Sequence, residues 1–450
     1  MNLRELSDAI GSGRLSPVHH VEEVIERLRA DKCNAIVHLD PDDAMDQARR
    51  LADELADGRR RGPLHGVAIV VKDIIDVRGA PTRCGSNVMR DAPAAVADAV
   101  AVARLREAGA VIVAKSHTHE FAYGPTGDTA AEGAARNPRD LDRITGGSSS
   151  GSAAAVAAGY VPLGLGTDTG CSIRTPAALC GVVGLKPRFG LVPTTGVFPL
   201  SETCDHIGLV GGDAHAVRAG YVALTGEQPA ARDRTLVIGR PADPYWRVAD
   251  EAIADAVDEA ARRLAAAGHR VEEVDLPGID DLAATYRPIV GGEAYTTHAG
   301  WLAQRPQDYQ PITAERLMAS ADQPATSYVD AQRTRRRVAA GLTEHLTGVD
   351  VLLTPTTPLR ATPIGQPVAD GREVRAALLS LTLPFNLTGW PAVSTPVREP
   401  NGGLPAGVQL VGVGLPAAGS HAAGSHGAGS HPVGEHELLT LVEMLWQPAH

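Results

Sequence analysis

Short apolar runs alternate with amphipathic segments along most of the chain, and the two patterns predict different elements. Residues 67–71 form a continuous run of apolar, mostly β-branched side chains, which predicts a strand buried on both faces, with Lys72 at its end. Residues 40–57 are amphipathic and predict a helix that Gly58 ends. A second predicted helix, 97–108, leads through Gly109 into an apolar strand at 110–114. The same alternation predicts a helix at 250–267 and strands at 271–276, 350–354 and 406–413.

The N-terminal segment 1–60 is predicted to be helical. Ser16 and Pro17 are typical of a helix start, and Val21, Val24 and Leu28 recur behind them at helical spacing. Helices that alternate with short strands predict an α/β fold, in which a sheet is covered by helices on both faces. Because no Pro/Gly-rich break divides the chain, we expect a single domain over residues 1–450.

One low-complexity segment, 419–434, interrupts the pattern near the C-terminus. A Gly/Ser/His unit repeats there every five residues and spaces histidines regularly. One interpretation is a metal-binding loop. The other, which we favour, is a surface insertion ahead of a helix that begins near Glu435, because glycine-rich backbone does not preorganise ligands.

Composition narrows the classes of protein. The chain has 450 residues, of which 44% are hydrophobic and 21% charged, as is usual for a globular protein. A net charge of −11 without a dense Lys/Arg cluster argues against nucleic acid or an anionic membrane as a partner. The N-terminus lacks an apolar signal core, and no uncharged apolar run reaches the roughly 20 residues of a membrane span, so we expect a cytoplasmic protein. Five cysteines without Cys-x-x-Cys spacing indicate reduced thiols and no zinc site.

Glycines and serines gather in two neighbouring stretches, 146–152 and 166–174. Glycine lets the backbone approach a reacting group closely and serine supplies a nucleophile, so the stretches predict acyl transfer to a hydroxyl group. A flexible linker would not carry the apolar segment that separates them. Ser149 also lies in a Gly-x-Ser-x-Gly pattern, which is typical of the nucleophile elbow of α/β-hydrolases. The charged segment 139–145 before it, however, is not the apolar strand that such an elbow follows.

Three separated blocks resemble the amidase signature family. They are 64–73, the glycine- and serine-rich block that runs from 146 to the Gly-Leu-Lys-Pro sequence at 184–187, and Asp205-His206-Ile207-Gly208. The resemblance extends over nearly the whole chain, with residues 64–210 as the signature core. It implies a large mixed open β-sheet covered by helices on both faces, and a reaction that needs neither a cofactor nor a metal ion.

The resemblance also implies a catalytic triad. Ser172 would be the nucleophile, Ser148 the bridging serine and Lys72 the base. A lysine at the end of an apolar strand loses hydration, so its neutral amine becomes available to accept a proton from Ser148. The alternative is a buried structural lysine that is paired with Asp73 or Asp76.

Further site positions follow from the same resemblance. The peptide bond between Gly147 and Ser148 is expected to be cis, Ser149, Asp168 and Arg174 are expected to support the site, and the oxyanion hole is expected from the backbone amides of Thr169, Gly170, Cys171 and Ser172. Phe121 and Tyr123 are expected near the acyl group. Cys171 replaces the glycine usual in the family, at a cost of about 1 kcal/mol if the position needs a positive φ. Cys171 as the nucleophile is the weaker alternative, because no motif places a histidine beside it.

The sequence therefore predicts an amidase that cleaves the C–N bond of a small amide through a serine acyl-enzyme and releases ammonia or an amine. An aromatic content of 4% disfavours a long lipid channel. The expected partner is a small-molecule amide substrate, and the assembly considered is a homodimer. Two alternatives stay open. One is the amidotransferase A chain of a glutamine-dependent, tRNA-linked enzyme. The other is a non-catalytic binding protein, which the intact Lys72, Ser148 and Ser172 disfavour.

Overall fold

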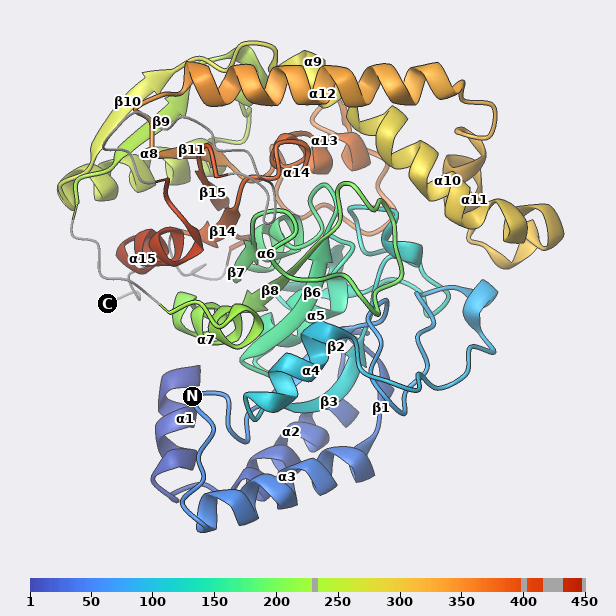
Figure 1. The fold of residues 1–450 in the computed structure, drawn as a ribbon, viewed down its shortest axis with the longest axis vertical. Coiled ribbons are helices and arrows are strands. Elements are labelled where there is room, and N and C mark those ends of the chain that lie inside the picture. The colour runs from blue at the N-terminus through green and yellow to red at the C-terminus, as the bar shows by residue number, and fades with distance from the viewer. Residues whose placement is uncertain (229–233, 398–402, 416–431, 447–450) are drawn as a thin grey trace.

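A mixed sheet of eleven strands runs through the computed structural model (Figure 1), which describes residues 1–228, 234–397, 403–415 and 432–446. The strand order is β1-β3-β2-β6-β8-β7-β14-β15-β11-β9-β10. In that order the strands are β1 (Ile36–Leu39), β3 (Val111–Ser116), β2 (Ala68–Lys72), β6 (Leu163–Asp168), β8 (His206–Gly211), β7 (Val183–Lys186), β14 (Ala392–Pro396), β15 (Gly407–Gly412), β11 (Val351–Pro355), β9 (Val237–Pro241) and β10 (Arg270–Val274). Two small hairpins, β4 (Arg136–Asn137) with β5 (Asp140–Ile144) and β12 (Val368–Ala369) with β13 (Arg372–Glu373), lie outside it.

The direction of the strands brings two chain segments to one edge of the sheet. β2 pairs in parallel with both β3 and β6, whereas β6, β8, β7, β14, β15 and β11 are joined by antiparallel pairs. Because parallel strands end at the same edge, Lys72 at the end of β2 and Asp168 at the end of β6 lie at the same edge of the sheet. The loop that follows β6 therefore starts beside Lys72.

Helices cover both faces of the sheet, as predicted. One apolar core is formed with α2 (Pro17–Arg29), α3 (Pro41–Ala56), α5 (Ser150–Ala157) and α6 (Arg174–Cys180). The other core is formed with α1 (Leu3–Gly11), α4 (Val100–Glu107), α7 (Ala214–Thr225), α8 (Glu251–Ala266) and α15 (Glu435–Leu445). In β2, Val70 belongs to the first core, whereas Ile69 and Val71 belong to the second. This alternation confirms that the apolar run at 67–71 is buried on both faces.

The second half of the chain forms a further group of helices. Its members are α9 (Ile279–Ala284), α10 (Tyr286–Gln304), α11 (Pro311–Met318), α12 (Ala325–His345), α13 (Val374–Ser380) and α14 (Pro384–Leu387). The long α12 crosses the top of the view in Figure 1, and α10 and α11 descend from it on the right. Sequence patterns predicted no element at 277–349 or at 355–405, so these helices are additions to the expected fold.

Most predicted boundaries differ from the structure by one to three residues. Helix 97–108 begins only at Val100, because Ala99 is extended at φ −57° and ψ 150°. Strand 271–276 corresponds to β10, which ends at Val274. Residues 416–431 of the histidine-rich repeat lie outside the described part of the chain, and the helix expected near Glu435 is α15.

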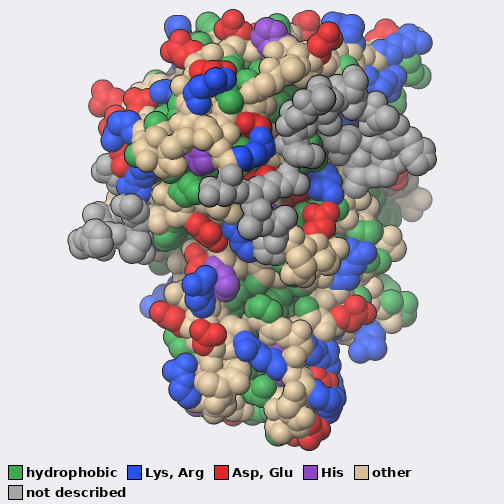
Figure 2. Space-filling model, turned by 60° about the vertical axis from the view of Figure 1, so that its left-hand side comes forward, with side chains coloured by type: hydrophobic (Ala, Val, Ile, Leu, Met, Phe, Trp, Pro, Cys, Tyr) green, Lys and Arg blue, Asp and Glu red, His purple; other side chains and the backbone are tan. Residues whose placement is uncertain are grey.

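The surface carries charges of both signs. On the face shown in Figure 2, basic and acidic side chains are interspersed among the described residues and form no continuous basic field. None of the described helices combines the length and apolarity needed to cross a bilayer. Within the same residues, no group of three or more His, Cys, Asp or Glu side chains is arranged to hold a metal ion.

Candidate active site

Lys72 occupies the position that the sequence predicts for a catalytic base. Its side chain is completely buried, and its Nζ lies 2.7 Å from Ser148 Oγ and 2.8 Å from Thr167 Oγ1. The structural alternative does not occur, because Asp73 pairs with Lys115 at 2.8 Å and Asp76 accepts a hydrogen bond from Thr82. Burial lowers the pKa of Lys72 from 10.5 to about 7, against an opposing contribution from the nearby carboxylates. A large neutral fraction of the amine is therefore present near neutral pH.

The bridging position Ser148 follows the one cis peptide bond of the described residues, Gly147–Ser148. Glycine is required at 147 by space, since a Cβ there would lie 2.8 Å from the amide nitrogen of Gly127. The backbone carbonyl of Ser148 accepts a hydrogen bond from His119 N at 3.1 Å. This hydrogen bond and the close approach of Gly147 to Gly127 hold the turn that presents the Ser148 hydroxyl group to Lys72.

Ser149 points in a different direction from its neighbour. Its Oγ donates to the carbonyl of Thr167 at 3.1 Å and accepts from the Thr167 N–H at 3.3 Å, while its own N–H donates to the carbonyl of Ser172 at 3.1 Å. The side chain is fully buried against β6. These contacts fit a support role and leave no free hydroxyl for the elbow assignment.

Ser172 lies in the loop that joins β6 to α6 and lines a cavity of about 310 Å³. Within the described structure, the backbone N–H groups of the four successive residues Thr169, Gly170, Cys171 and Ser172 donate to no protein acceptor. Cys171 and Ser172 line the cavity, and this run of four free N–H groups suits an oxyanion hole. The loop is held by Thr169 Oγ1, which donates to Asp205 Oδ1 at 2.5 Å, while Asp205 Oδ2 accepts from the N–H groups of Leu200 and Ser201.

Asp168 and Arg174 form a fully buried ion pair at the base of this loop. Arg174 donates through Nη2 to Asp168 Oδ1 at 2.8 Å and through Nε to Oδ2 at 3.0 Å. Burial alone would raise the pKa of Asp168, but the charge of Arg174 more than offsets it and holds this pKa well below its usual range. Arg174 also donates to Asn386 Oδ1 and Gln409 Oε1, two buried partners that sequence reasoning missed.

Cys171 is accommodated without the backbone strain considered from the sequence. It is absent from the positive-φ residues, so the anticipated cost of a left-handed cysteine does not arise. Its Sγ donates to the Gly147 carbonyl at 3.5 Å and the side chain lines the cavity. Burial raises the pKa of this thiol to about 12, which argues against a thiolate nucleophile.

The two aromatic residues expected near the acyl group separate in the structure. Tyr123 lines the cavity, whereas Phe121 is buried behind the wall in an aromatic cluster with Phe198, His298, Trp301 and Tyr309. Phe121 and Ala122 both have positive φ values, 48° and 59°. The backbone therefore turns here, and the side chains of Phe121 and Tyr123 do not lie on one side, as they would in an extended strand. Of the two residues, only Tyr123 therefore lies on the wall of the cavity that contains Ser172.

Most of the remaining wall comes from helices that the sequence analysis did not assign to the site. They contribute Tyr286, Arg287, Val290 and Gly291 from α10, Arg316 from α11, and Arg375, Ala376 and Leu379 from α13. Space is tight where they meet the loop, because a Cβ at Gly170 would lie 2.7 Å from Leu379 Cδ1 and closer still to the Tyr286 hydroxyl. A side chain at 170 would therefore force Tyr286 and Leu379 to move.

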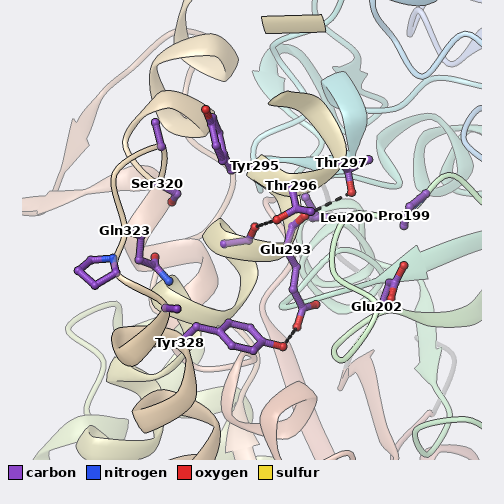
Figure 3. A pocket seen from close by; sticks show the side chains of 14 residues that line it. Pro199, Leu200, Glu202, Glu293, Tyr295, Thr296, Thr297, Ser320, Gln323 and Tyr328 are labelled. Carbon is purple, nitrogen blue, oxygen red and sulfur yellow. Dashed lines mark hydrogen bonds between the residues drawn. The ribbon is translucent and has the colours of Figure 1, made fainter. Parts of the chain in front are cut away.

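A second cavity, of about 420 Å³, adjoins the first and shares Leu200 and Ser320 with it. Figure 3 shows its wall, in which Glu293 reaches towards Tyr328. The carboxylate of Glu293 accepts from the Tyr328 hydroxyl at 2.8 Å, from Ser201 Oγ at 2.6 Å and from Thr203 Oγ1 at 2.8 Å. This cavity lacks Ser172 among its lining residues, so the candidate chemistry belongs to the first cavity.

Comparisons with known proteins agree with this geometry. The amidase family model matches residues 19–415. The AtzE component of 1-carboxybiuret hydrolase from Pseudomonas sp. (strain ADP) is 36% identical over 437 residues, which cover 91% of this chain and 94% of the relative. The A chain of the glutamyl-tRNA(Gln) amidotransferase of Symbiobacterium thermophilum is 35% identical over 446 residues, covering 89% and 90%. A solved amidase crystal structure is 36% identical, has a TM-score of 0.87 and covers 99% of both chains. The chain therefore belongs to the amidase signature family of amide-hydrolysing enzymes.

Proposed function

We propose that this protein hydrolyses the C–N bond of a small linear amide through an acyl-enzyme on Ser172, with Ser148 and Lys72 as its proton relay. One observation carries the proposal. Lys72 is fully buried, has no carboxylate partner within the described residues, and holds its Nζ 2.7 Å from Ser148 Oγ. A buried lysine that contacts no carboxylate is costly to protonate, which makes it a base near neutral pH.

In the first half of the reaction, Ser172 Oγ attacks the amide carbonyl carbon. The Ser172 proton passes to Ser148 Oγ, whose own proton passes to the neutral Lys72 Nζ. The negative charge that develops on the carbonyl oxygen is stabilised by the free N–H groups of the 169–172 loop. The C–N bond then breaks, the nitrogen takes a proton back through the relay, and ammonia or an amine leaves.

In the second half, a water molecule attacks the Ser172 ester. The relay removes its proton as before, the C–O bond to Ser172 breaks while Ser172 Oγ takes this proton back from the relay, and the carboxylic acid is released. Asp168, Arg174 and Ser149 support the geometry without touching the reacting atoms, because their polar groups are already engaged with the backbone and with each other. A cavity of about 310 Å³ suits a small acyl group. The five buried, unpaired cysteines suit a reducing compartment such as the cytoplasm.

The test is release of ammonia from a panel of small primary amides. We expect at least one amide to be hydrolysed, and Ser172→Ala to reduce its turnover by at least about a thousandfold, since the acyl-enzyme route is lost. Ser320→Ala is the matched control, because Ser320 lines the same cavity but takes no part in the relay; it should stay within a few-fold of wild type. Near-normal turnover in Ser172→Ala would refute the proposal.

The A chain of a tRNA-linked amidotransferase is the second candidate, since a relative of that name is 35% identical along most of this chain. The two candidates differ in what they need. A hydrolase turns over small amides by itself, whereas an amidotransferase component delivers ammonia to a partner-bound acceptor. Glutamine hydrolysis that appears only after a copurifying partner is added would favour the second candidate.

A further inference from the structure

Three arginines from three different helices line the cavity that contains Ser172. They are Arg287 of α10, Arg316 of α11 and Arg375 of α13. Glu373 is the one carboxylate among the lining residues, and it is occupied at the start of α13, where it accepts from the N–H groups of Arg375 at 3.2 Å and Ala376 at 2.6 Å. The charge of the cavity wall is therefore positive.

These arginines are poorly paired with protein carboxylates. Arg375 lies 3.6 Å from Asp128, and its Nη1 is buried without a hydrogen-bond partner. Arg316 donates to the backbone carbonyl of Tyr123 at 2.8 Å and lies 5.9 Å from the centre of the Tyr123 ring. In the described part of the chain, neither Arg316 nor Arg287 has a carboxylate within 4 Å. Guanidinium groups stay charged in proteins, so the half-buried Arg316 and the exposed Arg287 are both available to bind an anion.

The adjoining cavity has the opposite character. Its lining includes Glu202 and Glu293, and neither a lysine nor an arginine is among its lining residues (Figure 3). An anionic group would be attracted to the arginines and repelled by the two glutamates across the shared wall of Leu200 and Ser320. The charge distribution therefore favours an anion in the cavity that contains Ser172 over one in the adjoining cavity.

From these observations we propose that the substrate is an amide that also carries a carboxylate, held by Arg316 and Arg287 while the amide carbonyl lies at Ser172. The proposal rests on the proposed function and adds the chemical class of its substrate. Planar guanidinium groups match a carboxylate geometrically and bind it with two parallel hydrogen bonds. Arg316 is half-buried, and burial followed by the charge of Arg375 lowers the pKa of its guanidinium. A bound carboxylate would neutralise part of the positive charge of Arg287, Arg316 and Arg375.

The test compares isosteric pairs of amides that differ only in charge. Malonamate, succinamate and glutaramate each carry a carboxylate where malonamide, succinamide and glutaramide carry a second amide. With the full-length wild-type protein, we expect at least one carboxylate member to exceed its neutral partner in kcat/KM by tenfold or more. Arg316→Gln and Arg287→Gln should each reduce that preference at least fivefold, chiefly through KM for the carboxylate. Arg372→Gln, on β13 and outside the cavity lining, is the matched control and should keep the preference.

A protection experiment keeps the proposal testable if none of the six compounds is turned over. A fluorophosphonate that labels Ser172 should be slowed more by succinamate than by succinamide in wild type, and equally by both in Arg316→Gln. Equal protection in wild type, protection by neither compound, or a preference for the neutral amides would overturn the charge proposal alone. Absence of both labelling at Ser172 and amide hydrolysis would instead refute the proposed function.

Discussion

Replacing Lys72 with methionine tests the neutral base through protein stability, independently of any substrate. Lys72 is completely buried and its pKa falls from 10.5 in a hydrated lysine to about 7 in the folded protein. Such a shift corresponds to about 5 kcal/mol of unfolding free energy. Because the folded pKa is below the unfolded pKa, this stability is fully present above pH 10.5 and is lost progressively as the pH falls towards 7. Below pH 7 the loss is complete.

The stability of Lys72→Met relative to wild type should therefore change with pH. Methionine removes the cost of a buried charge but leaves the hydroxyl groups of Ser148 and Thr167 without the partner that Lys72 supplies, at about 1–3 kcal/mol each. At alkaline pH, only the second effect remains, so Lys72→Met should be less stable than wild type. On going from about pH 9.5 to about pH 6.5, the stability of the variant relative to wild type should rise by about 3 kcal/mol.

The measurement is reversible urea unfolding of both proteins at several pH values, because titrating groups that do not interact with Lys72 affect both proteins equally and cancel in the difference. Lys32→Met, which changes an exposed lysine, is the control and should give a difference that does not vary with pH. A difference between Lys72→Met and wild type that stays constant across the range would refute the lowered pKa and, with it, the neutral amine on which the relay depends.

Three other predictions concern the same site. The wild-type kcat/KM should rise about tenfold per pH unit below pH 7 and level off above about pH 8, because the reactive form of Lys72 is the neutral amine; a flat profile with chemistry rate-limiting would contradict this. Arg174→Met should lower the free energy of unfolding by about 3–5 kcal/mol in urea titrations, because Asp168 would be left buried and unpaired; a loss below about 1 kcal/mol would contradict the importance of the pair. Gly170→Ala should reduce kcat at least tenfold, because its Cβ would collide with Tyr286 and Leu379 and move the loop, whereas Gly341→Ala, with no atom within 4 Å, should leave kcat unchanged.

The parts of the site that the sequence predicts are those encoded by local patterns. Lys72 stands out because a charged side chain at the end of a continuous apolar strand is unusual, and the structure accordingly buries it. The glycines and serines at 146–152 and 166–174 stand out by composition, and the parallel pairing of β2 with β6 brings both stretches to Lys72. The helical covering of both sheet faces follows from the alternation of the two hydrophobic periods.

Other parts depend on tertiary packing and leave no local signal. Arg287, Arg316 and Arg375 lie on three helices and line one cavity only because those helices pack around it. Asn386 and Gln409 reach Arg174 from more than two hundred residues away. Phe121 and Tyr123 are neighbours in sequence, yet the left-handed backbone between them sends one into the core and leaves the other on the cavity wall. The sequence spacing of Phe121 and Tyr123 does not by itself predict this turn.

The central claim is that Ser172 forms the covalent intermediate. Its most direct test is to label the wild-type protein with a fluorophosphonate and map the modified residue by mass spectrometry. The relay predicts one label, on Ser172, that is lost in Ser172→Ala and strongly slowed in Lys72→Met, because the nucleophile then lacks its base. A label on Ser149, Ser148 or Cys171, or undiminished labelling of Ser172 in Lys72→Met, would contradict the account.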